Sequence, residues 1–232
     1  MRERRRATVV AAAVSAALLS ALAGCGSSAD GSGSVVTNVR SAKDPDGLHA
    51  IVMPKAYHVP PVTLRNAAGT PYDVQKGFTK PITLVVFGYT HCPDICQLVM
   101  ANIASALTRL DPQQRAKVAV QFVTTDPTRD TASVLRSYLD RFNPAFDGVT
   151  GDIRTITAYG EKVGVPIQTG AKLPGGGYDV SHGTQVLGVL PGGTAPLLWT
   201  QDTSPGDLAS DLTSILDRGV PPAPTSDGSS SS

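Results

Sequence analysis

The chain has 232 residues, of which 41% are hydrophobic and 17% are charged, and its formal net charge at pH 7 is +1. This balance, with no basic patch, argues against nucleic acid as a partner, because proteins that bind nucleic acid cluster lysine and arginine. The chain contains three cysteines, Cys25, Cys92 and Cys96. Their positions carry most of the functional information in the sequence.

Residues 1–24 are predicted to be a signal peptide. The first six residues include four arginines, and residues 7–23 form an apolar stretch of small residues that is too short for a comfortable membrane span. Loss of the four arginines and Glu3 takes the formal charge of the chain from +1 to −2.

The leader ends in Leu22-Ala23-Gly24-Cys25, which resembles the bacterial lipobox, whose cysteine becomes the lipidated first residue of the mature chain. The alternative is an ordinary signal peptide followed by an unrelated cysteine. A lipidated Cys25 leaves one thiol pair and no odd cysteine in the mature protein. We therefore expect a lipoprotein on the extracytoplasmic face of the cell membrane, because two acyl chains give firm anchoring.

One domain is expected between two flexible segments. Residues 25–50 include a run rich in glycine and serine and are interpreted as a flexible tether. Residues 220–232 are interpreted as a disordered tail. The roughly 160 residues between the flexible ends suffice for one domain with a real core, which is assigned to residues 51–219.

The spacing of apolar residues predicts the elements of this domain. In chain order these are a short strand pair at 62–65 and 71–74, a strand at 82–88, a helix that follows the cysteines and runs to residue 110, a strand at 118–124, a helix at 134–142, a helix capped by Asp152, strands at 185–190 and 196–199, and a helix capped by Ser204. The strand at 82–88 is apolar throughout, which is typical of a strand buried on both faces of a central sheet.

This order of elements predicts an α/β protein with a thioredoxin-like fold, in which helices flank a central mixed β-sheet. The alternation at the front requires parallel strands with crossovers, and the late hairpin adds antiparallel strands to the same sheet. In such a fold Cys92 and Cys96 lie at the carboxyl end of a central strand and the amino end of a helix. The helix dipole there favours anionic sulfur.

Cys92 and Cys96 are four residues apart, so on a helix both sulfurs lie on one face. Together they can bind a soft metal ion or react with a substrate disulfide. A structural disulfide is a third interpretation, but a bridge that closes so short a loop constrains the unfolded chain little. Thioredoxin-type reductants have two residues between their cysteines, and this chain has three. The wider spacing suits two sulfurs on one ion, and thiolates prefer Cu(I).

A trigonal copper site needs a third ligand, and the chain has four histidines. His49 and His58 precede the core and are expected at the surface. His91 adjoins the first cysteine and is interpreted as a loop residue that tunes the thiolate, with ligation as the alternative. His182 is expected to open the hairpin strand after a loop at 173–181. A lone histidine there is more often structural, but the hairpin strands of this fold lie near the cysteine helix.

The segment Asp126-Pro127-Thr128-Arg129-Asp130 follows the second buried strand. One interpretation is a helix-capping turn with a surface Arg–Asp pair, which is worth roughly 0–1 kcal/mol when exposed. The other interpretation follows from the fold, since the carboxyl end of that strand borders the cysteine site. The segment would then line the site or meet a partner.

These motifs together resemble the SCO/SenC family, whose members are thioredoxin-fold copper chaperones for cytochrome c oxidase. The matching blocks are residues 87–96 (Phe-Gly-Tyr-Thr-His-Cys-Pro-Asp-Ile-Cys), residues 123–131, residues 146–151 and the single His182 before a strand. The resemblance extends over about residues 62–216. It implies that Cys92, Cys96 and His182 are copper ligands.

Two positions depart from the family pattern. Gln97 stands where the family often has proline, directly after the second cysteine. Ser181 stands where many members have aspartate, directly before the histidine, and Asp179 lies two residues earlier. The resemblance therefore implies the three ligands, and it leaves open whether a carboxylate lies beside the metal.

Two functions remain open from the sequence. The first is a lipid-anchored copper chaperone that passes copper to the binuclear copper site of cytochrome c oxidase, with the copper-site subunit as its partner. The second is a thiol–disulfide oxidoreductase that keeps the cysteines of that site, or of another copper chaperone, reduced. Only the first requires His182. A thiol peroxidase is a third and weaker hypothesis. Those enzymes have threonine three residues before the reactive cysteine, where this chain has Tyr89.

Overall fold

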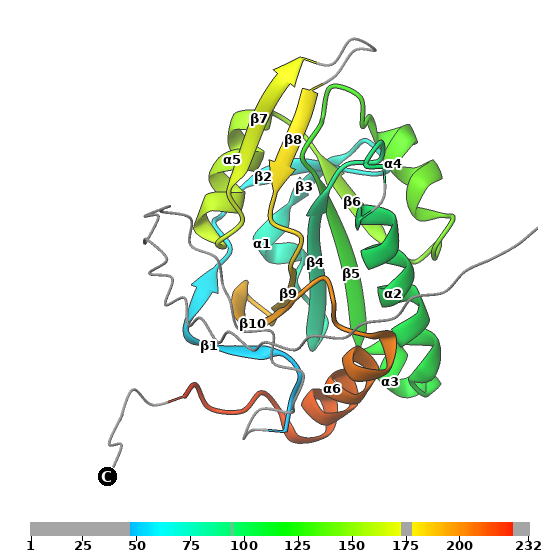
Figure 1. Ribbon diagram of the computed structural model, residues 1–232, viewed down its shortest axis with the longest axis vertical. Coiled ribbons are helices and arrows are strands. Elements are labelled where there is room, and N and C mark those ends of the chain that lie inside the picture. Colours follow the sequence, from blue (N-terminus) through cyan, green and yellow to red (C-terminus); the bar gives the residue numbers. More distant parts are fainter. Residues whose placement is uncertain (1–46, 94, 173–177, 225–232) are drawn as a thin grey trace, which may run out of the picture. The chain divides into compact units, whose positions relative to one another are not determined.

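The computed structural model describes residues 47–93, 95–172 and 178–224 (Figure 1). The predicted signal peptide, the predicted lipidation site Cys25 and most of the predicted tether and tail lie outside these residues. None of the helices in the described part of the chain is long and apolar enough to cross a membrane.

Within the described residues, the centre of the domain is an eight-stranded sheet with the order β1-β10-β9-β4-β5-β6-β2-β3. Its strands are β1 (Ile51–His58), β2 (Thr63–Asn66), β3 (Pro71–Asp73), β4 (Ile82–Gly88), β5 (Val118–Thr124), β6 (Asp147–Thr150), β9 (Val186–Val189) and β10 (Thr194–Trp199). The pairs β4–β5 and β5–β6 are parallel, and the other pairs are antiparallel. The sheet is therefore mixed, as the order of elements predicts.

The helices lie on both faces of this sheet (Figure 1). They are α1 (Val74–Gly77), α2 (Ile95–Arg109), α3 (Pro112–Ala116), α4 (Ala132–Leu139), α5 (Ile153–Lys162) and α6 (Pro205–Arg218). Asp152 caps α5 and Ser204 caps α6, as predicted, because each side chain accepts hydrogen bonds from N–H groups that have no partner within the helix.

Strand β4 is buried along its whole length. Its side chains alternate between two apolar clusters, because successive residues of a strand point to opposite faces of the sheet. Leu84 and Val86 belong to the cluster that contains residues of α2, α4 and α6. Val85 and Phe87 belong to the cluster that contains residues of α5. The prediction of a central strand covered on both faces is confirmed.

The predicted loop at 173–181 is wrong at its carboxyl end. Strand β8 (Tyr178–His182) pairs with β7 (Ile167–Lys172), so His182 ends a strand and does not open one. The next strand, β9, begins at Val186. The sequence of β7, Ile-Gln-Thr-Gly-Ala-Lys, alternates too weakly between apolar and polar residues to give a strand signal.

The packed region begins before the predicted domain boundary at residue 51. Leu48 and Ala50 are 1% and 0% exposed, although the predicted tether includes both. Strand β1 follows directly and contains Pro54, which obscures the strand pattern. Proline is tolerated there because β1 lies at the edge of the sheet.

His49 is held in place by hydrogen bonds, contrary to the prediction of a surface residue. Its backbone N–H donates to Asp211 Oδ1 at 3.0 Å, and its ring Nδ1 lies 3.0 Å from the same oxygen. The N–H of Ala50 and the indole N–H of Trp199 both donate to Asp211 Oδ2 at 2.8 Å. Asp211 thereby ties the start of the domain and β10 to α6. His58 is exposed, as predicted.

Candidate functional site

The cysteine loop, residues 89–93, connects the end of β4 to the start of α2. At the end of β4 the backbone N–H and the hydroxyl of Thr125 donate to the carbonyl of Gly88 at 2.7 and 3.1 Å. A turn follows, in which the N–H of Cys92 donates to the carbonyl of Tyr89 at 3.2 Å. The loop therefore starts at a fixed point of the sheet and brings Cys92 to the amino end of α2.

Cys92 and Cys96 lie together at this helix end. Both are reduced thiols, and they are 5% and 3% exposed. The N–H of Cys96 donates to the sulfur of Cys92, with 3.5 Å between N and Sγ. Because the first N–H groups of a helix lack partners within it, the Cys92 sulfur takes the role of a capping acceptor. The helix dipole also favours negative charge at this position.

Cys96 holds its proton more tightly than an ordinary cysteine. Burial is the largest cause that raises its pKa, and the side-chain hydrogen bond with Cys92 comes next. The carboxylate of Asp130 adds a smaller effect in the same direction. A metal ion that binds both sulfurs must displace this proton, because the thiolate is the form that binds metals.

Gly88 leaves room for the sulfur of Cys96. A Cβ atom at this position would lie 3.1 Å from Cys96 Sγ and 2.9 Å from the ring of Phe122. A side chain there would push against both groups, since contacts this short are strongly repulsive. This role of Gly88 was not predicted from the sequence. The available signal was a glycine at the end of an otherwise apolar strand, which often marks a close approach.

Asp130 fixes the cysteine loop to the sheet. Its carboxylate is fully buried and accepts hydrogen bonds from the N–H of Thr90 at 2.9 Å, the hydroxyl of Thr90 at 2.6 Å and the hydroxyl of Thr124 at 2.7 Å. The hydroxyl of Thr150 donates to the backbone carbonyl of Asp130 at 3.0 Å. Asp130 therefore joins the loop to both β5 and β6, a role that the sequence did not assign.

The interpretation of Arg129 and Asp126 as a surface pair is wrong. Asp126 is 4% exposed, and Nε of Arg129 donates a short hydrogen bond to its Oδ2. The guanidinium carbon of Arg129 lies 5.9 Å from the centre of the Tyr89 ring. The segment after β5 therefore packs against the cysteine loop, as the alternative interpretation predicts.

His91 has a half-exposed side chain next to Cys92. Its Nδ1 lies 3.0 Å from the hydroxyl oxygen of Thr90 and 3.7 Å from Oδ1 of Asp130. These contacts orient the ring through the loop itself. They fit the predicted loop residue, whose effect on the thiolate stays a prediction.

His182 is described by its backbone alone, and the side chain of Asp179 likewise lies outside what the structure describes. Across the hairpin His182 pairs with Ile167. Ile167 belongs to the apolar cluster that contains Phe87 and against which Tyr89 packs. Among the side chains that the structure describes, no group of three histidine, cysteine, aspartate or glutamate residues forms a metal site. The assignment of His182 as third ligand therefore stays a prediction.

Comparison with known proteins identifies the family. A family model named SCO1/SenC matches residues 53–217, which is most of the domain and more than half of the chain. The chain belongs to the SCO1/SenC family. The resemblance seen in the sequence is thereby confirmed, and the cysteine loop lies within the matched region.

One curated relative of this SCO1/SenC chain is the mitochondrial protein SCO2 of Saccharomyces cerevisiae. The two are 31% identical over 123 residues, which cover 53% of this chain and 40% of the yeast protein. The chain thus spans less than half of the yeast protein's length. The activity of the whole yeast protein is therefore only a proposal for this chain.

Two solved structures resemble the domain. ScoI of Bradyrhizobium japonicum, solved with copper bound, is 25% identical with a TM-score of 0.58, over 69% of this chain and 98% of that one. Apo Sco1 of Thermus thermophilus is 26% identical with a TM-score of 0.65, over 74% of this chain and 98% of that one. The predicted thioredoxin-like fold is confirmed, and copper, the predicted cofactor, is confirmed for a relative.

Proposed function

We propose that this SCO1/SenC protein is a copper chaperone that binds copper through Cys92, Cys96 and His182 and delivers it to the binuclear copper site of cytochrome c oxidase. The observation that carries the proposal is the pair of buried, reduced thiols at the amino end of α2, with Cys96 N 3.5 Å from Cys92 Sγ. Two sulfurs at one helix end suit a single soft ion. The copper-bound relative from Bradyrhizobium japonicum supports this assignment.

In this function copper is the cargo. Cys96 Sγ carries a proton when copper is absent and loses it when copper binds. Binding of the ion releases the proton from Cys96 Sγ, because the thiolate is the ligand. The raised pKa of Cys96 favours return of that proton when the recipient's ligands take the ion. The same burial that raises the pKa therefore assists release, which a chaperone needs as much as it needs binding.

The third ligand in this proposal is His182. Two thiolates alone leave a vacant position for water or a competing ligand, and an imidazole suits copper. The backbone contacts of the β7–β8 hairpin support this choice, since Ile167, opposite His182, packs on the cluster that Tyr89 also contacts.

We also propose that lipidated Cys25 holds the domain on the extracytoplasmic face of the cell membrane. The support is the lipobox-like Leu22-Ala23-Gly24-Cys25 after an apolar leader. The tether predicted after Cys25 would let the domain reach the copper-site subunit of a membrane-embedded oxidase, or another copper chaperone that supplies the ion.

A thiol–disulfide oxidoreductase is the second candidate, and the unequal surroundings of the two thiols favour it. The Cys92 sulfur receives an N–H donor, whereas Cys96 is held protonated. Cys92 would attack a target disulfide, and Cys96, once deprotonated, would release the target by closing a Cys92–Cys96 bridge. Two electrons pass to the target, whose cysteines become thiols and can then bind copper.

Replacement of His182 separates the two functions. His182→Ala should weaken copper retention against a competing chelator by at least about 10–100-fold, because loss of even an outer partner of a metal ligand typically costs that much. It should leave the rate of exchange with a small disulfide unchanged, because exchange needs no imidazole. His58→Ala, an exposed histidine on β1, is the matched control and should change neither quantity.

The cellular test uses cells that lack the native protein, with each variant expressed at the same level. His182→Ala should fail to restore oxidase activity if copper transfer is the task. Full restoration by His182→Ala at normal copper supply would reject the chaperone function and leave the oxidoreductase.

A further inference from the structure

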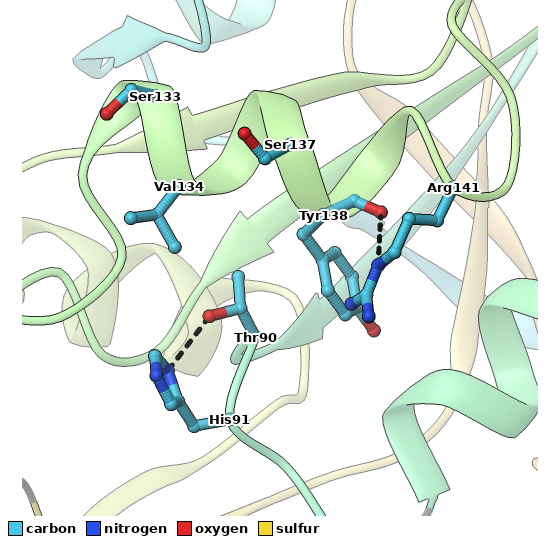
Figure 2. A pocket seen from close by; sticks show the side chains of 7 residues that line it. All are labelled: Thr90, His91, Ser133, Val134, Ser137, Tyr138 and Arg141. Carbon is cyan, nitrogen blue, oxygen red and sulfur yellow. Dashed lines mark hydrogen bonds between the residues drawn. The ribbon is translucent and has the colours of Figure 1, made fainter.

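A pocket of about 440 Å³ lies directly beside the cysteine loop and is not used by the proposed copper site. Figure 2 shows its two sides. Thr90 and His91 line it from the cysteine loop, and Ser133, Ser137, Tyr138 and Arg141 line it from α4 and the residues just after that helix. A protein that approaches Cys92 therefore meets this pocket as well.

The pocket carries a positive charge that the described residues leave unbalanced. Arg141 donates from Nε to the backbone carbonyl of Tyr138 at 3.4 Å, and its guanidinium carbon lies 4.7 Å from the centre of the Tyr138 ring. Within the described part of the chain, Arg141 forms no ion pair. The buried carboxylate of Asp130 accepts hydrogen bonds from Thr90 and Thr124, and Asp140 pairs with Arg136 at 2.9 Å.

Hydrogen-bond donors accompany this charge. Ser133 and Ser137 are exposed on α4, and both residues line the same pocket. The hydroxyl of Tyr138 is buried and has no hydrogen-bond partner among the described residues. Burial is the largest cause that raises the pKa of Tyr138, so this hydroxyl keeps its proton at neutral pH and can donate it. A cation with hydroxyl donors is the combination that receives a carboxylate.

We propose that this pocket receives a carboxylate side chain, Asp or Glu, of the protein that exchanges copper with the cysteine pair. The proposal rests on the proposed function and adds the chemistry of the partner's surface. A guanidinium at the rim of an interface attracts the opposite charge and sets the orientation of approach, which affects the rate of association most. The pocket would thus orient the partner so that its copper ligands meet Cys92.

The test measures copper transfer from the loaded protein to the metal-free soluble domain of the oxidase copper-site subunit by stopped flow. Arg141→Glu should slow transfer about tenfold at low ionic strength, the lower end of typical steering effects. Ser137→Glu, which places a negative charge in the same pocket, should slow transfer as well. Arg141→Lys should transfer at a rate near that of the unmodified protein. The differences should shrink at high salt, because exposed charges are screened.

Arg154→Glu is the charge-matched control. Arg154 lies on α5 with a side chain that is 91% exposed, and it does not line the pocket. This variant should transfer copper as the unmodified protein does. Copper retention against a chelator should be the same in all variants, because none of the replaced residues is a proposed ligand.

The outcomes separate this inference from the function on which it rests. If the unmodified protein transfers copper and Arg141→Glu does so equally fast, the pocket proposal is overturned and the chaperone stands. Equal slowing by Arg154→Glu, or loss of copper retention in Arg141→Glu, overturns it too. If the unmodified protein retains copper but transfers none, both proposals fall. Restoration of the Arg141→Glu rate by an acidic-to-lysine change in the partner domain would support the pocket directly.

Discussion

Two buried carboxylates organise two regions of this domain, and the regions differ in the donors that surround them. Asp130 and Asp211 are 0% and 1% exposed. Asp211 accepts from backbone and indole N–H groups at the start of the domain and on β10, and its Oδ1 also lies 3.0 Å from His49 Nδ1. Asp130 accepts from one backbone N–H and two threonine hydroxyls around the cysteine loop. Both carboxylates are satisfied, as buried charge requires.

The difference in donors predicts a difference in rigidity. An N–H group can only donate, whereas a hydroxyl can rotate and can accept as well as donate. The backbone and indole donors around Asp211 thus permit one arrangement, while the two hydroxyls at Asp130 can adjust. An adjustable anchor suits a loop whose cysteines must change ligands, and a fixed anchor suits the region that closes the fold.

The largest effect on stability is expected from Asp211→Asn. In either orientation the new amide NH₂ faces an N–H group, because both oxygens of Asp211 accept from N–H donors. Loss of charged acceptors at buried donors costs about 3 kcal/mol of unfolding free energy. Denaturation of the reduced, metal-free protein in urea measures this cost. Asp140→Asn, an exposed replacement, is the control and should stay within about 0.5 kcal/mol of the unmodified protein.

A smaller effect on stability is expected from Asp130→Asn, about 1 kcal/mol. The new amide can donate to the hydroxyl oxygen of Thr90, whose hydrogen can turn to His91 Nδ1, 3.0 Å away. The remaining oxygen keeps the N–H of Thr90 and the hydroxyl of Thr124. If Asp130→Asn destabilises as much as Asp211→Asn, the argument from hydroxyl donors is wrong.

The same pair of variants separates an effect on the site from an effect on the fold. Asp130→Asn should speed alkylation of the cysteine pair at neutral pH, since it loosens the loop and removes a negative charge that raises the pKa of Cys96. Asp211→Asn should leave alkylation unchanged although it costs more stability. Equal rates in the two variants would show that Asp130 has no special role at the site.

Sequence reasoning succeeded where a local pattern decides the structure. The run 82–88 predicts β4 because it is apolar apart from Thr83, and such a run requires cover on both faces. Asp152 and Ser204 predict the starts of α5 and α6 because a cap acts within its own turn. Cys92 and Cys96 could be paired from their spacing alone.

Sequence reasoning failed where partners distant in the chain decide the structure. The sequence does not show that Asp130 and Asp211 are buried, because their donors come from segments up to 162 residues away. Gly88 is required by Cys96 and Phe122, a contact that only the folded arrangement creates. The β7–β8 hairpin depends on cross-strand pairing, which the weak alternation of apolar and polar residues in its sequence does not predict.

A further expected effect is a pH dependence that the cysteine region has and the Asp211 region lacks. Burial, and then the hydrogen bond with Cys92, raises the pKa of Cys96 above its ordinary value of 9.0 in the folded protein. The unfolded chain releases this proton above about pH 9, while the folded protein keeps it. The stabilisation is therefore complete below pH 9 and is lost as the pH rises, by at most about 1.4 kcal/mol per pH unit.

Unfolding free energies of the reduced, metal-free protein between pH 8 and about pH 10 measure this slope. The range ends there because the buried tyrosines begin to contribute above the ordinary tyrosine pKa of about 10. Cys96→Ala should remove the part of the slope that Cys96 causes. Asp211→Asn should lower stability at every pH and keep the slope. An unchanged slope in Cys96→Ala would mean that the proton on Cys96 is not held by the fold, and the proposed exchange of that proton for copper would lose its physical basis.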